Sequence, residues 1–414
     1  MSALRVAIIS DLHADHRENP DTRVYVEPAV SRRGLHPIFD LEAFVTQEQL
    51  SADYLLLVGD TANRANAEGL QYGWRRANLI ARQLGARLIA TPGNHDVVTR
   101  ESASDHAVML KNLLPTFPTG NESMDAEFWR SGWCVVESDD HRILVLDSTA
   151  DFPPYPTGAT DGSQELSNYL SFVNQGGLRP EVEAELENYL AHAPRKLNVA
   201  MLHHHPLEHQ LHTYMQDGYG PMRRGGELIE LFTRFPSAGR WLVVHGHKHI
   251  PQLVSATTIS TNGPFVLCAA SVGAKIWDPV NTVTRNQFHL VEVRLDPADP
   301  NIGLAGSVMS YTWGFGNGWH QSEQTGSGLP GSAGFGNSIE PAVLATRIDA
   351  AVPSEAGAFI WYTDLLNTVP QLPYVMPGDW DLLEDEVNAH GIFFVRDRAR
   401  AIVNVSRPEA KSGK

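Results

Sequence analysis

Five short polar segments hold most of the residues in this chain that could perform chemistry. They are rich in Asp, Asn and His, side chains that bind transition-metal ions. In chain order they are Asp11-Leu12-His13, Gly59-Asp60-Thr61-Ala62-Asn63, Gly93-Asn94-His95-Asp96, His203-His204-His205-Pro206 and Gly246-His247-Lys248-His249. A single segment of this kind is a weak signal, because imidazole has many uses that need no metal. Together, the segments predict one binuclear metal site.

Each polar segment is expected on a loop where a buried strand ends. Short runs of Val, Ile and Leu are typical of strands that are buried on both faces. Such runs cover residues 6–10, 54–58, 87–90, 142–146, 198–202 and 241–244, and most of them lead directly into Asp, Asn or His. Open α/β sheets bind their ligands at the carboxyl ends of strands. We therefore expect the segments to converge there.

Helical patterns lie between these runs. Apolar residues recur at helical spacing from Leu70 to Leu84, and Gly85 follows where a helix C-terminus favours glycine. Similar patterns cover residues 41–50, 104–114, 180–191 and 227–232. The alternation of strands and helices predicts a layered α/β protein. Later apolar runs over residues 265–270, 288–295 and 306–311 have no helices between them and predict an antiparallel meander that closes a second sheet.

The composition changes in the last quarter of the chain. Gly, Ser and Asn are frequent from Gly314 to Gly336, and residues 321–334 are typical of a flexible linker. Beyond it the chain again contains apolar runs, but no motif that indicates chemistry. We therefore predict a catalytic domain over residues 1–320, a Gly/Ser-rich linker over 321–338 and a small C-terminal accessory element over 339–414.

Bulk composition limits the partners. The net charge of −16 argues against binding of duplex nucleic acid, whereas bound cations would still allow small anionic substrates. No apolar run is long enough to span a membrane, and nothing at the N-terminus is typical of a signal peptide. We expect a cytoplasmic protein without membrane contact, with residues 339–414 available for a homo-oligomer or partner contact.

The motif set resembles that of the calcineurin-like metallophosphoesterase superfamily. The superfamily pattern of Asp-x-His, Gly-Asp-x-x-Asp/Asn, Gly-Asn-His-Asp/Glu, a histidine before proline and Gly-His-x-His is matched in full within residues 4–320. The spacing and the Gly-Asn-His-Asp form are most similar to the cyclic-nucleotide phosphodiesterase and glycerophosphodiesterase branches. The resemblance implies a layered α-β-β-α sandwich of two mixed β-sheets flanked by helices. It does not extend to residues 339–414.

The resemblance also implies a ligand set for two metal ions. Asp11, His13, Asp60 and His249 would hold the first ion, while Asp60, Asn94, one histidine of the 203–205 run and His247 would hold the second. Asp60 would bridge the two ions. Alignment on Pro206 favours His203 as the ligand, with His204 as the alternative. Mixed nitrogen and oxygen ligation suits manganese, iron or zinc better than magnesium or calcium.

In the implied reaction, a hydroxide bridging both ions attacks phosphorus in line while His95 acts as the general acid that protonates the leaving oxygen. Related enzymes often pair this histidine with an aspartate at the position where this chain has Asn63. We therefore predict that Asn63 orients His95, which would lose its proton at a lower pH than in the aspartate-bearing members.

Other residues near the segments are candidates for substrate contacts or for supporting the ligands. Asn63, Arg17, Arg64, His205 and His209 form the main group. Asp15, His16, Arg32 and Arg33 lie in the same loops, and Tyr219, Trp277 and Trp313 could stack on a base. For each of them a surface or core role without substrate contact is an open alternative.

The sequence therefore predicts a dinuclear metal-dependent phosphohydrolase. The favoured substrate is a small phosphodiester such as a cyclic nucleotide or a glycerophosphodiester. The alternatives are a phosphomonoesterase or nucleotidase, a nuclease acting on short single strands, and a non-catalytic scaffold that retains the fold.

Overall fold

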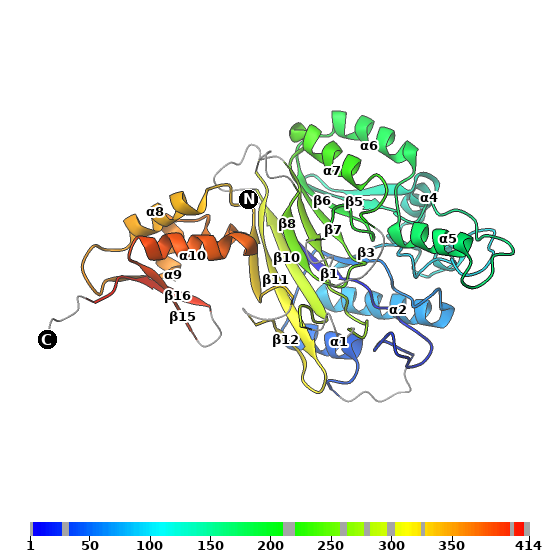
Figure 1. The fold of residues 1–414 in the computed structure, drawn as a ribbon, viewed down its shortest axis with the longest axis horizontal. Coiled ribbons are helices and arrows are strands. Elements are labelled where there is room, and N and C mark those ends of the chain that lie inside the picture. The colour runs from blue at the N-terminus through cyan, green and yellow to red at the C-terminus, as the bar shows by residue number, and fades with distance from the viewer. Residues whose placement is uncertain are drawn as a thin grey trace.

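Two β-sheets lie face to face, and helices cover their outer faces (Figure 1). The computed structural model describes residues 3–26, 33–209, 220–256, 263–276, 282–295, 303–323, 328–397 and 401–409. The arrangement is the α-β-β-α sandwich that the sequence predicts, with a small element at the C-terminal end. Among the described residues, no helix has the length and apolarity that crossing a membrane requires.

The first sheet carries the N-terminal part of the chain. Its strand order is β12 (Gly318–Gln321), β11 (Ala305–Gly314), β10 (Gln287–Arg294), β1 (Leu4–Ile9), β2 (Tyr54–Val58) and β3 (Arg87–Thr91). Strands β1, β2 and β3 are parallel, so their carboxyl ends meet at one edge. Helices α1 (Pro37–Gln47) and α2 (Ala67–Leu84) cover its outer face (Figure 1).

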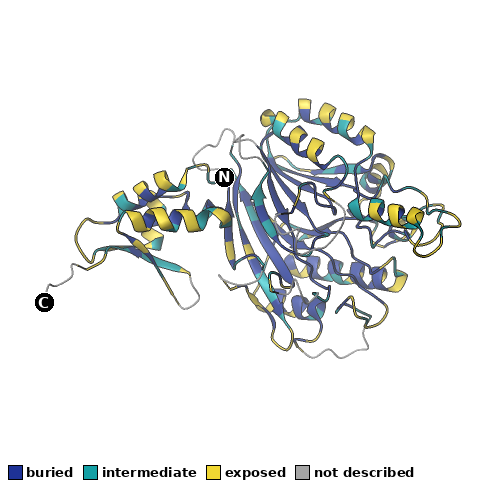
Figure 2. Cartoon of the chain, viewed as in Figure 1, coloured by how far each residue is buried: buried dark blue, intermediate teal, exposed yellow. Residues whose placement is uncertain are grey.

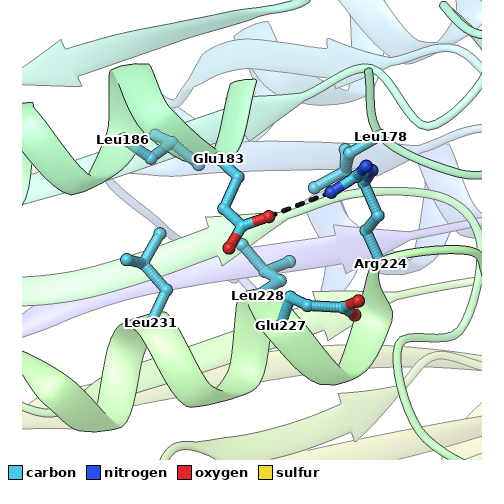
Figure 3. A pocket seen from close by; sticks show the side chains of 7 residues that line it. All are labelled: Leu178, Glu183, Leu186, Arg224, Glu227, Leu228 and Leu231. Atoms are coloured by element: carbon cyan, nitrogen blue, oxygen red, sulfur yellow. Dashed lines mark hydrogen bonds and ion pairs between the residues drawn. The ribbon is translucent and has the colours of Figure 1, made fainter. Parts of the chain in front are cut away.

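The second sheet has the order β4 (Trp133–Glu137), β5 (His141–Leu146), β6 (Leu197–Met201), β7 (Trp241–His245), β9 (Phe265–Cys268) and β8 (Gln252–Ser255). Strands β5, β6, β7 and β9 are parallel. Helices α6 (Pro180–His192) and α7 (Gly225–Arg234) cover its outer face. Glu183 on α6 pairs with Arg224, just before α7, at 3.0 Å (Figure 3). Helices α4 (Glu122–Ser131) and α5 (Gln164–Gln175) complete this half.

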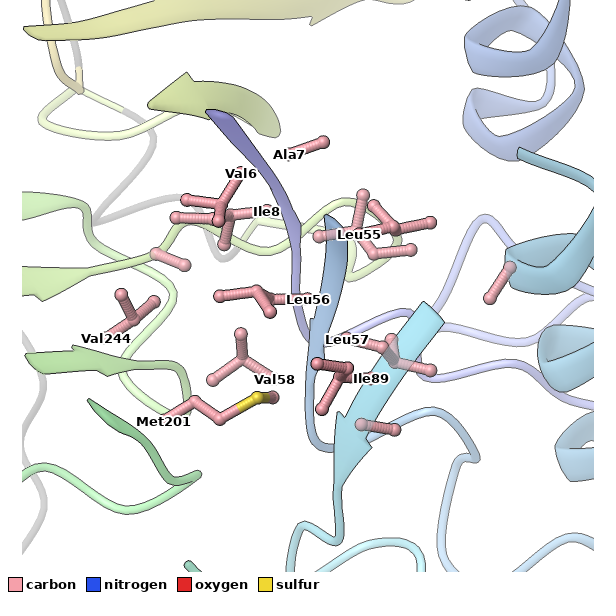
Figure 4. Packing of buried hydrophobic residues seen from close by; sticks show 14 of the residues in the cluster. Val6, Ala7, Ile8, Leu55, Leu56, Leu57, Val58, Ile89, Met201 and Val244 are labelled. Atoms are coloured by element: carbon pink, nitrogen blue, oxygen red, sulfur yellow. The ribbon is translucent and has the colours of Figure 1, made fainter. Parts of the chain in front are cut away.

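The main core lies between the sheets. Val6, Ile8, Leu56 and Val58 of the first sheet point toward Met201 and Val244 of the second (Figure 4). The alternate residues of β1 and β2, among them Ala7 and Leu55, point to the helical side and are equally buried. Burial on both faces explains why these strands are continuous apolar runs. Exposed residues are concentrated on the outer faces of the helices (Figure 2).

Local signals explain where the helices begin and end. The Asn66 side chain accepts a hydrogen bond from the backbone N–H of Gly69 and caps α2, while Gly85 ends α2 with a φ of 68°. The helix predicted over 104–114 is much shorter, because α3 covers only Val108–Lys111. Asp105 accepts a hydrogen bond from the backbone N–H of Ala107 at 3.0 Å and holds a turn there instead.

The later strands differ from the sequence prediction. An antiparallel meander of β10, β11 and β12 forms, but it extends the first sheet, because β10 pairs with β1 and places Ile8 opposite His289. Strand β9 belongs to the second sheet and runs parallel to β7. The prediction that one meander closes a second sheet was therefore wrong.

Part of the predicted linker is also an ordered strand. β13 (Ser332–Phe335) pairs with β11, and a Cβ at Gly334 would overlap the backbone of Pro373. The flexible linker predicted over residues 321–334 was wrong at this strand. Its small residues allow the chain to pass close to the backbone of the C-terminal element, which explains the Gly-rich composition.

The C-terminal element has a core of its own. It consists of α8 (Pro341–Ala351), β14 (Phe359–Trp361), α9 (Tyr362–Thr368), α10 (Trp380–Ala389), β15 (Phe393–Arg396) and β16 (Ile402–Ser406), with the strand order β14-β16-β15. Helix α10 buries Leu383 and Val387 and exposes Asp381, Asp385 and Glu386.

One buried carboxylate joins α1 to the tip of the β11–β12 hairpin. Asp40 accepts hydrogen bonds from the backbone N–H of Gly34 at 2.9 Å and from Nε1 of Trp313 at 2.7 Å. We predict that Asp40→Ala lowers the free energy of unfolding by about 1–3 kcal/mol, because both donors lose their acceptor in a buried place. Urea unfolding measures this loss. Asp139→Ala, in an exposed turn, is the control, and equal stability of the two variants would contradict the prediction.

Candidate metal centre

Seven predicted ligand side chains meet at one place in the structure. They come from loops that follow the carboxyl ends of β1, β2, β3, β6 and β7, on both sheets. The side chains are those of Asp11, His13, Asp60, Asn94, His203, His247 and His249. The spatial convergence that the sequence predicts is therefore present.

The first group surrounds the carboxylate of Asp11. His249 Nε2 lies 3.2 Å from Asp11 Oδ1 and 3.1 Å from His13 Nε2. His13 Nε2 is in turn 3.7 Å from Asp60 Oδ2. Four donor atoms predicted for one ion thus lie within a few ångströms of each other.

The second group lies on the other side of Asp60. His203 Nε2 is 3.2 Å from Asp60 Oδ2, and His247 Nδ1 is 3.2 Å from Asn94 Oδ1. The rings of His203 and His247 are 5.2 Å apart between centroids. Asp60 Oδ2 contacts donors of both groups, which is the position that a bridging ligand requires.

His203 and His204 differ in how they face the cluster. His203 Nδ1 contacts the carbonyl oxygen of Val58 at 2.9 Å, which directs Nε2 toward Asp60. His204 Nδ1 lies 2.8 Å from Ser148 Oγ, and within the part of the chain that the structure describes its buried Nε2 has no hydrogen-bond partner. His204 also groups with His203 and His247 at metal-binding distance. His203 fits the bridged arrangement around Asp60 better, while His204 remains an alternative ligand.

The backbone at these loops is unusual. Left-handed φ angles occur at Asp11, His13, Asp60, His247 and His249, with values between 47° and 71°. Non-glycine residues rarely adopt this conformation, which costs of order 1 kcal/mol or more per residue. Strain of this kind is typical of functional sites. Glycine is also needed at position 59, because a Cβ there would overlap the ring of His203.

Burial and charge set the protonation states. Burial by itself raises the pKa of Asp60, but the charges of His203 and His95 outweigh it and hold this pKa well below its usual value. Burial alone would lower the pKa of His203, but the charge of Asp60 raises it to about 9. Burial lowers the pKa of His13 to about 3 and that of His247 well below its usual value. Neutral imidazoles and ionised carboxylates are the forms that bind metals, so His203 must lose its proton when an ion binds.

His95 lies at the edge of the cluster and is partly exposed. Its backbone N–H donates to Asp60 Oδ1 at 2.8 Å, and its ring contacts that of His13 edge to face, with 4.7 Å between centroids. Its Nδ1 accepts a long hydrogen bond of 3.4 Å from the backbone N–H of Arg64. In the neutral ring this leaves the proton on Nε2. Burial lowers the pKa of His95.

Asn63 has a different partner from the one predicted. Its Nδ2 donates to Asp15 Oδ2 at 2.9 Å, and its Oδ1 has no hydrogen-bond partner among the described residues. The interpretation that Asn63 orients His95 was therefore wrong, because its amide is used to hold Asp15. Asp15 also accepts hydrogen bonds from Asn19 Nδ2 and from the backbone N–H of His16, both at 2.7 Å.

The two predicted arginine contacts lie on the surface. Arg64 pairs with Asp21 at 2.9 Å, and both side chains are about half exposed. Arg17 is exposed in the same region. An arginine whose charge is already compensated by a carboxylate attracts phosphate less strongly.

The remaining predicted contacts vary in position. The ring of His205 stacks on that of His247 with an interplanar angle of 11°, and His209 Nε2 contacts the carbonyl oxygen of Ile250 at 2.9 Å. Both side chains are buried, and they pack against His247 and the residue that follows His249. Arg32, Tyr219 and Trp277 lie outside the described residues.

Two supporting residues were not assigned a role from the sequence. Asp96 is fully buried and accepts hydrogen bonds from the backbone N–H groups of Ala62 at 2.7 Å and Gly93 at 2.9 Å, so it joins the loops after β2 and β3. Burial, followed by the charge of Asp60, raises its pKa to about 7. Ser148 contacts His204 from the loop after β5. The sequence could have indicated the role of Asp96, because Asp96 belongs to the Gly-Asn-His-Asp segment. Ser148 belongs to no motif, so its contact with His204 could not be predicted.

The donor set is consistent with two metal ions. Two buried carboxylates, a carboxamide and several imidazoles converge, and no described residue bonds to the buried Nε2 of His204. Buried polar atoms normally have hydrogen-bond partners, so this arrangement is expected where cations complete the coordination.

Comparison with known proteins identifies the family. The family model described as calcineurin-like phosphoesterase matches residues 4–251, more than half of the chain. The chain therefore belongs to the calcineurin-like phosphoesterases, which are metal-dependent phosphoric ester hydrolases with a dinuclear centre. A second family model, described as wHTH-Calcineurin_assc, matches residues 333–387. A search of curated proteins found no match.

Several solved structures are similar to this chain. A dimetal phosphatase from Danio rerio is 12% identical, with a TM-score of 0.47, and the match covers 77% of this chain and 98% of that one. A purple acid phosphatase from yellow lupin is 13% identical, with a TM-score of 0.46 and coverage of 74% and 51%. A 5′-nucleotidase precursor from Thermus thermophilus is 15% identical, with a TM-score of 0.37 and coverage of 75% and 55%.

The two neighbouring residues of the loop after β3 should respond differently to substitution. We predict that Asn94→Ala mainly weakens occupancy of the second metal position, because it removes the amide oxygen that lies beside His247. His95→Ala should leave metal content unchanged and lower turnover. Elemental analysis of the purified variants measures metal per chain. Equal metal loss in both variants would contradict the separate roles.

Proposed function

We propose that this enzyme is a phosphodiesterase that hydrolyses a small phosphodiester by in-line attack of water, with His95 as general acid. The observation that carries the proposal is the position of His95, which is partly exposed beside two donor groups that share Asp60. A group in this place can reach a leaving oxygen while the phosphoryl group lies over the cluster.

In this proposal Asp11, His13, Asp60 and His249 hold one ion, and Asp60, Asn94, His203 and His247 hold the other. When bound, the ions supply Lewis acidity to the phosphoryl oxygens and lower the pKa of water. The protein keeps the donors in place through strained, buried loops and through the hydrogen bonds of Asp96 to both loops. Rigid donors need little reorganisation when the substrate binds.

His95 would donate its proton from Nε2. The hydrogen bond from the His95 backbone N–H to Asp60 keeps the ring beside the cluster. A general acid must be the imidazolium, which carries protons on both nitrogens, so the long contact of the Arg64 N–H with Nδ1 belongs to the neutral ring. Because burial lowers the pKa of His95, the protonated ring is a stronger acid, but a smaller share of the ring is protonated at neutral pH. The proton matters most when the leaving oxygen is a strong base.

Charge supports a diester over a monoester. A diester has one negative charge on the reacting phosphate, whereas a monoester has up to two at neutral pH. Arg64 is already paired with Asp21, so it offers little extra positive charge for a dianion. The Gly-Asn-His-Asp form of the motif supports the same substrate class. A monoesterase or nucleotidase is the alternative that the next experiment separates.

The substrate preference is directly measurable. We predict that the manganese-loaded enzyme hydrolyses bis-(p-nitrophenyl) phosphate with a higher kcat/KM than p-nitrophenyl phosphate. Release of p-nitrophenol at saturating metal is the measurement, and the Asp60→Ala variant controls for contaminating phosphatases. A clear preference for the monoester would rule out the diester proposal and favour the nucleotidase.

The role of His95 is tested by changing the leaving group. We predict that His95→Ala lowers kcat by about 10²-fold or more for an alkyl ester, because an alkoxide needs a proton to leave. For a p-nitrophenyl ester, whose leaving group is stable as an anion, the loss should be clearly smaller. His192→Ala, on the exposed end of α6, is the matched control. Equal losses for both esters would show that His95 does not act as the acid.

A further inference from the structure

A pocket lies at the same edge of the first sheet as Asp11. It encloses about 380 Å³ and is lined mainly by the residues before β10 and by the tip of the β11–β12 hairpin. Because Ile8 pairs with His289 and Gln287 pairs with Thr312, the start of β10 and the end of β11 lie beside the carboxyl end of β1. The pocket wall therefore lies beside the carboxyl end of β1, after which Asp11 and His13 follow.

Two hydrogen-bonded connections join the pocket wall to the candidate ligands. Thr284 lines the pocket and donates from Oγ1 to the carbonyl oxygen of His249 at 2.9 Å. The backbone N–H of Arg23 donates to the carbonyl oxygen of Gly273 at 2.8 Å. The N–H of Gly273 donates in turn to the carbonyl oxygen of Asp11 at 3.2 Å. A ligand in this pocket would extend from the first metal position.

The pocket carries two positive charges beside aromatic rings. Arg23 lies over Trp313 at 5.6 Å and over Phe315 at 5.4 Å, and Arg285 donates to the carbonyl oxygen of Thr284 at 2.8 Å. Within the part of the chain that the structure describes, neither guanidinium forms an ion pair with a carboxylate. In a protein of net charge −16, two such arginines in one pocket favour an anionic ligand.

Phe315 is exposed at the tip of the β11–β12 hairpin, and hydrogen bonds fix the position of this tip. Its side chain is 64% exposed, although it stands on a short turn between two paired strands. The N–H of Gly316 donates to the carbonyl oxygen of Gly34 at 2.7 Å, and Asp40 holds the neighbouring Trp313 by its Nε1. A fixed, exposed aromatic ring beside a guanidinium is a surface on which a planar ligand can stack.

We propose that this pocket binds the unreacted part of a nucleotide substrate, with a phosphate on Arg23 and Arg285 and the base on Phe315. The inference rests on the proposed function and narrows its substrate to a nucleotide-containing phosphodiester with a second phosphate. The reacting phosphate lies at the metal centre, and the second phosphate and base occupy the pocket. The rest of the molecule then determines specificity without taking part in the chemistry.

Calorimetric titration of the metal-loaded full chain with ADP and with inorganic pyrophosphate tests the pocket. The His95→Ala background slows turnover during the titration. We expect Arg23→Gln and Arg285→Gln each to raise the Kd of both ligands by about tenfold or more. Phe315→Ala should raise the Kd of ADP by a similar factor and leave that of pyrophosphate unchanged, since pyrophosphate has no ring. Arg82→Gln, on the exposed face of α2, is the matched control.

The outcomes separate the pocket from the reaction. Unchanged Kd values in both arginine variants would overturn the pocket as an anion site, and an unchanged ADP Kd in Phe315→Ala would overturn the stacking. If the native enzyme hydrolyses no phosphodiester while ADP binding still depends on Arg23 and Phe315, the proposed function fails and the pocket stands. Thermal unfolding of each variant verifies that it is folded.

Discussion

The carboxylate of Asp60 is the interaction on which the rest of the site depends. It is almost fully buried and lies within 3.2 Å of His203 Nε2 and 3.7 Å of His13 Nε2, while its second oxygen accepts the N–H of His95. A second buried carboxylate, Asp11, belongs to the same cluster. Two negative groups buried this close together need compensating positive charge. The loops after several strands must therefore place their histidine nitrogens next to these carboxylates.

The positions of these histidines depend on rigid strands and on a strained backbone in the loops. The parallel strands of both sheets are buried on each face, which fixes the positions of their carboxyl ends. Ligand residues just beyond these ends take left-handed φ angles that unsupported loops would avoid. Asp96 joins two of the loops through backbone hydrogen bonds. The stability of the core thus offsets the local cost at the site.

The pocket beside β10 and the C-terminal element differ in charge. The pocket beside β10 has two arginines that make no ion pair with a described carboxylate, whereas helix α10 exposes several acidic residues. The C-terminal element matches a wHTH model and has the order helix, strand, two helices and two strands. The exposed acidic face of α10 disfavours contact with phosphate groups. That duplex nucleic acid is not a partner stays a prediction from the net charge.

Much of this could be predicted from the sequence, because apolar runs that end in Asp, Asn or His specify both strands and ligands. Asp11, Asp60 and His247 were predictable for that reason, and so was α2 with its terminal Gly85. Only the tertiary structure decided that β10 joins the first sheet, that β13 pairs with β11, and that the Asn63 amide holds Asp15 rather than His95. Local patterns reveal which residues are buried or polar, whereas the choice among several equivalent partners depends on distances that exist only once distant segments have packed together.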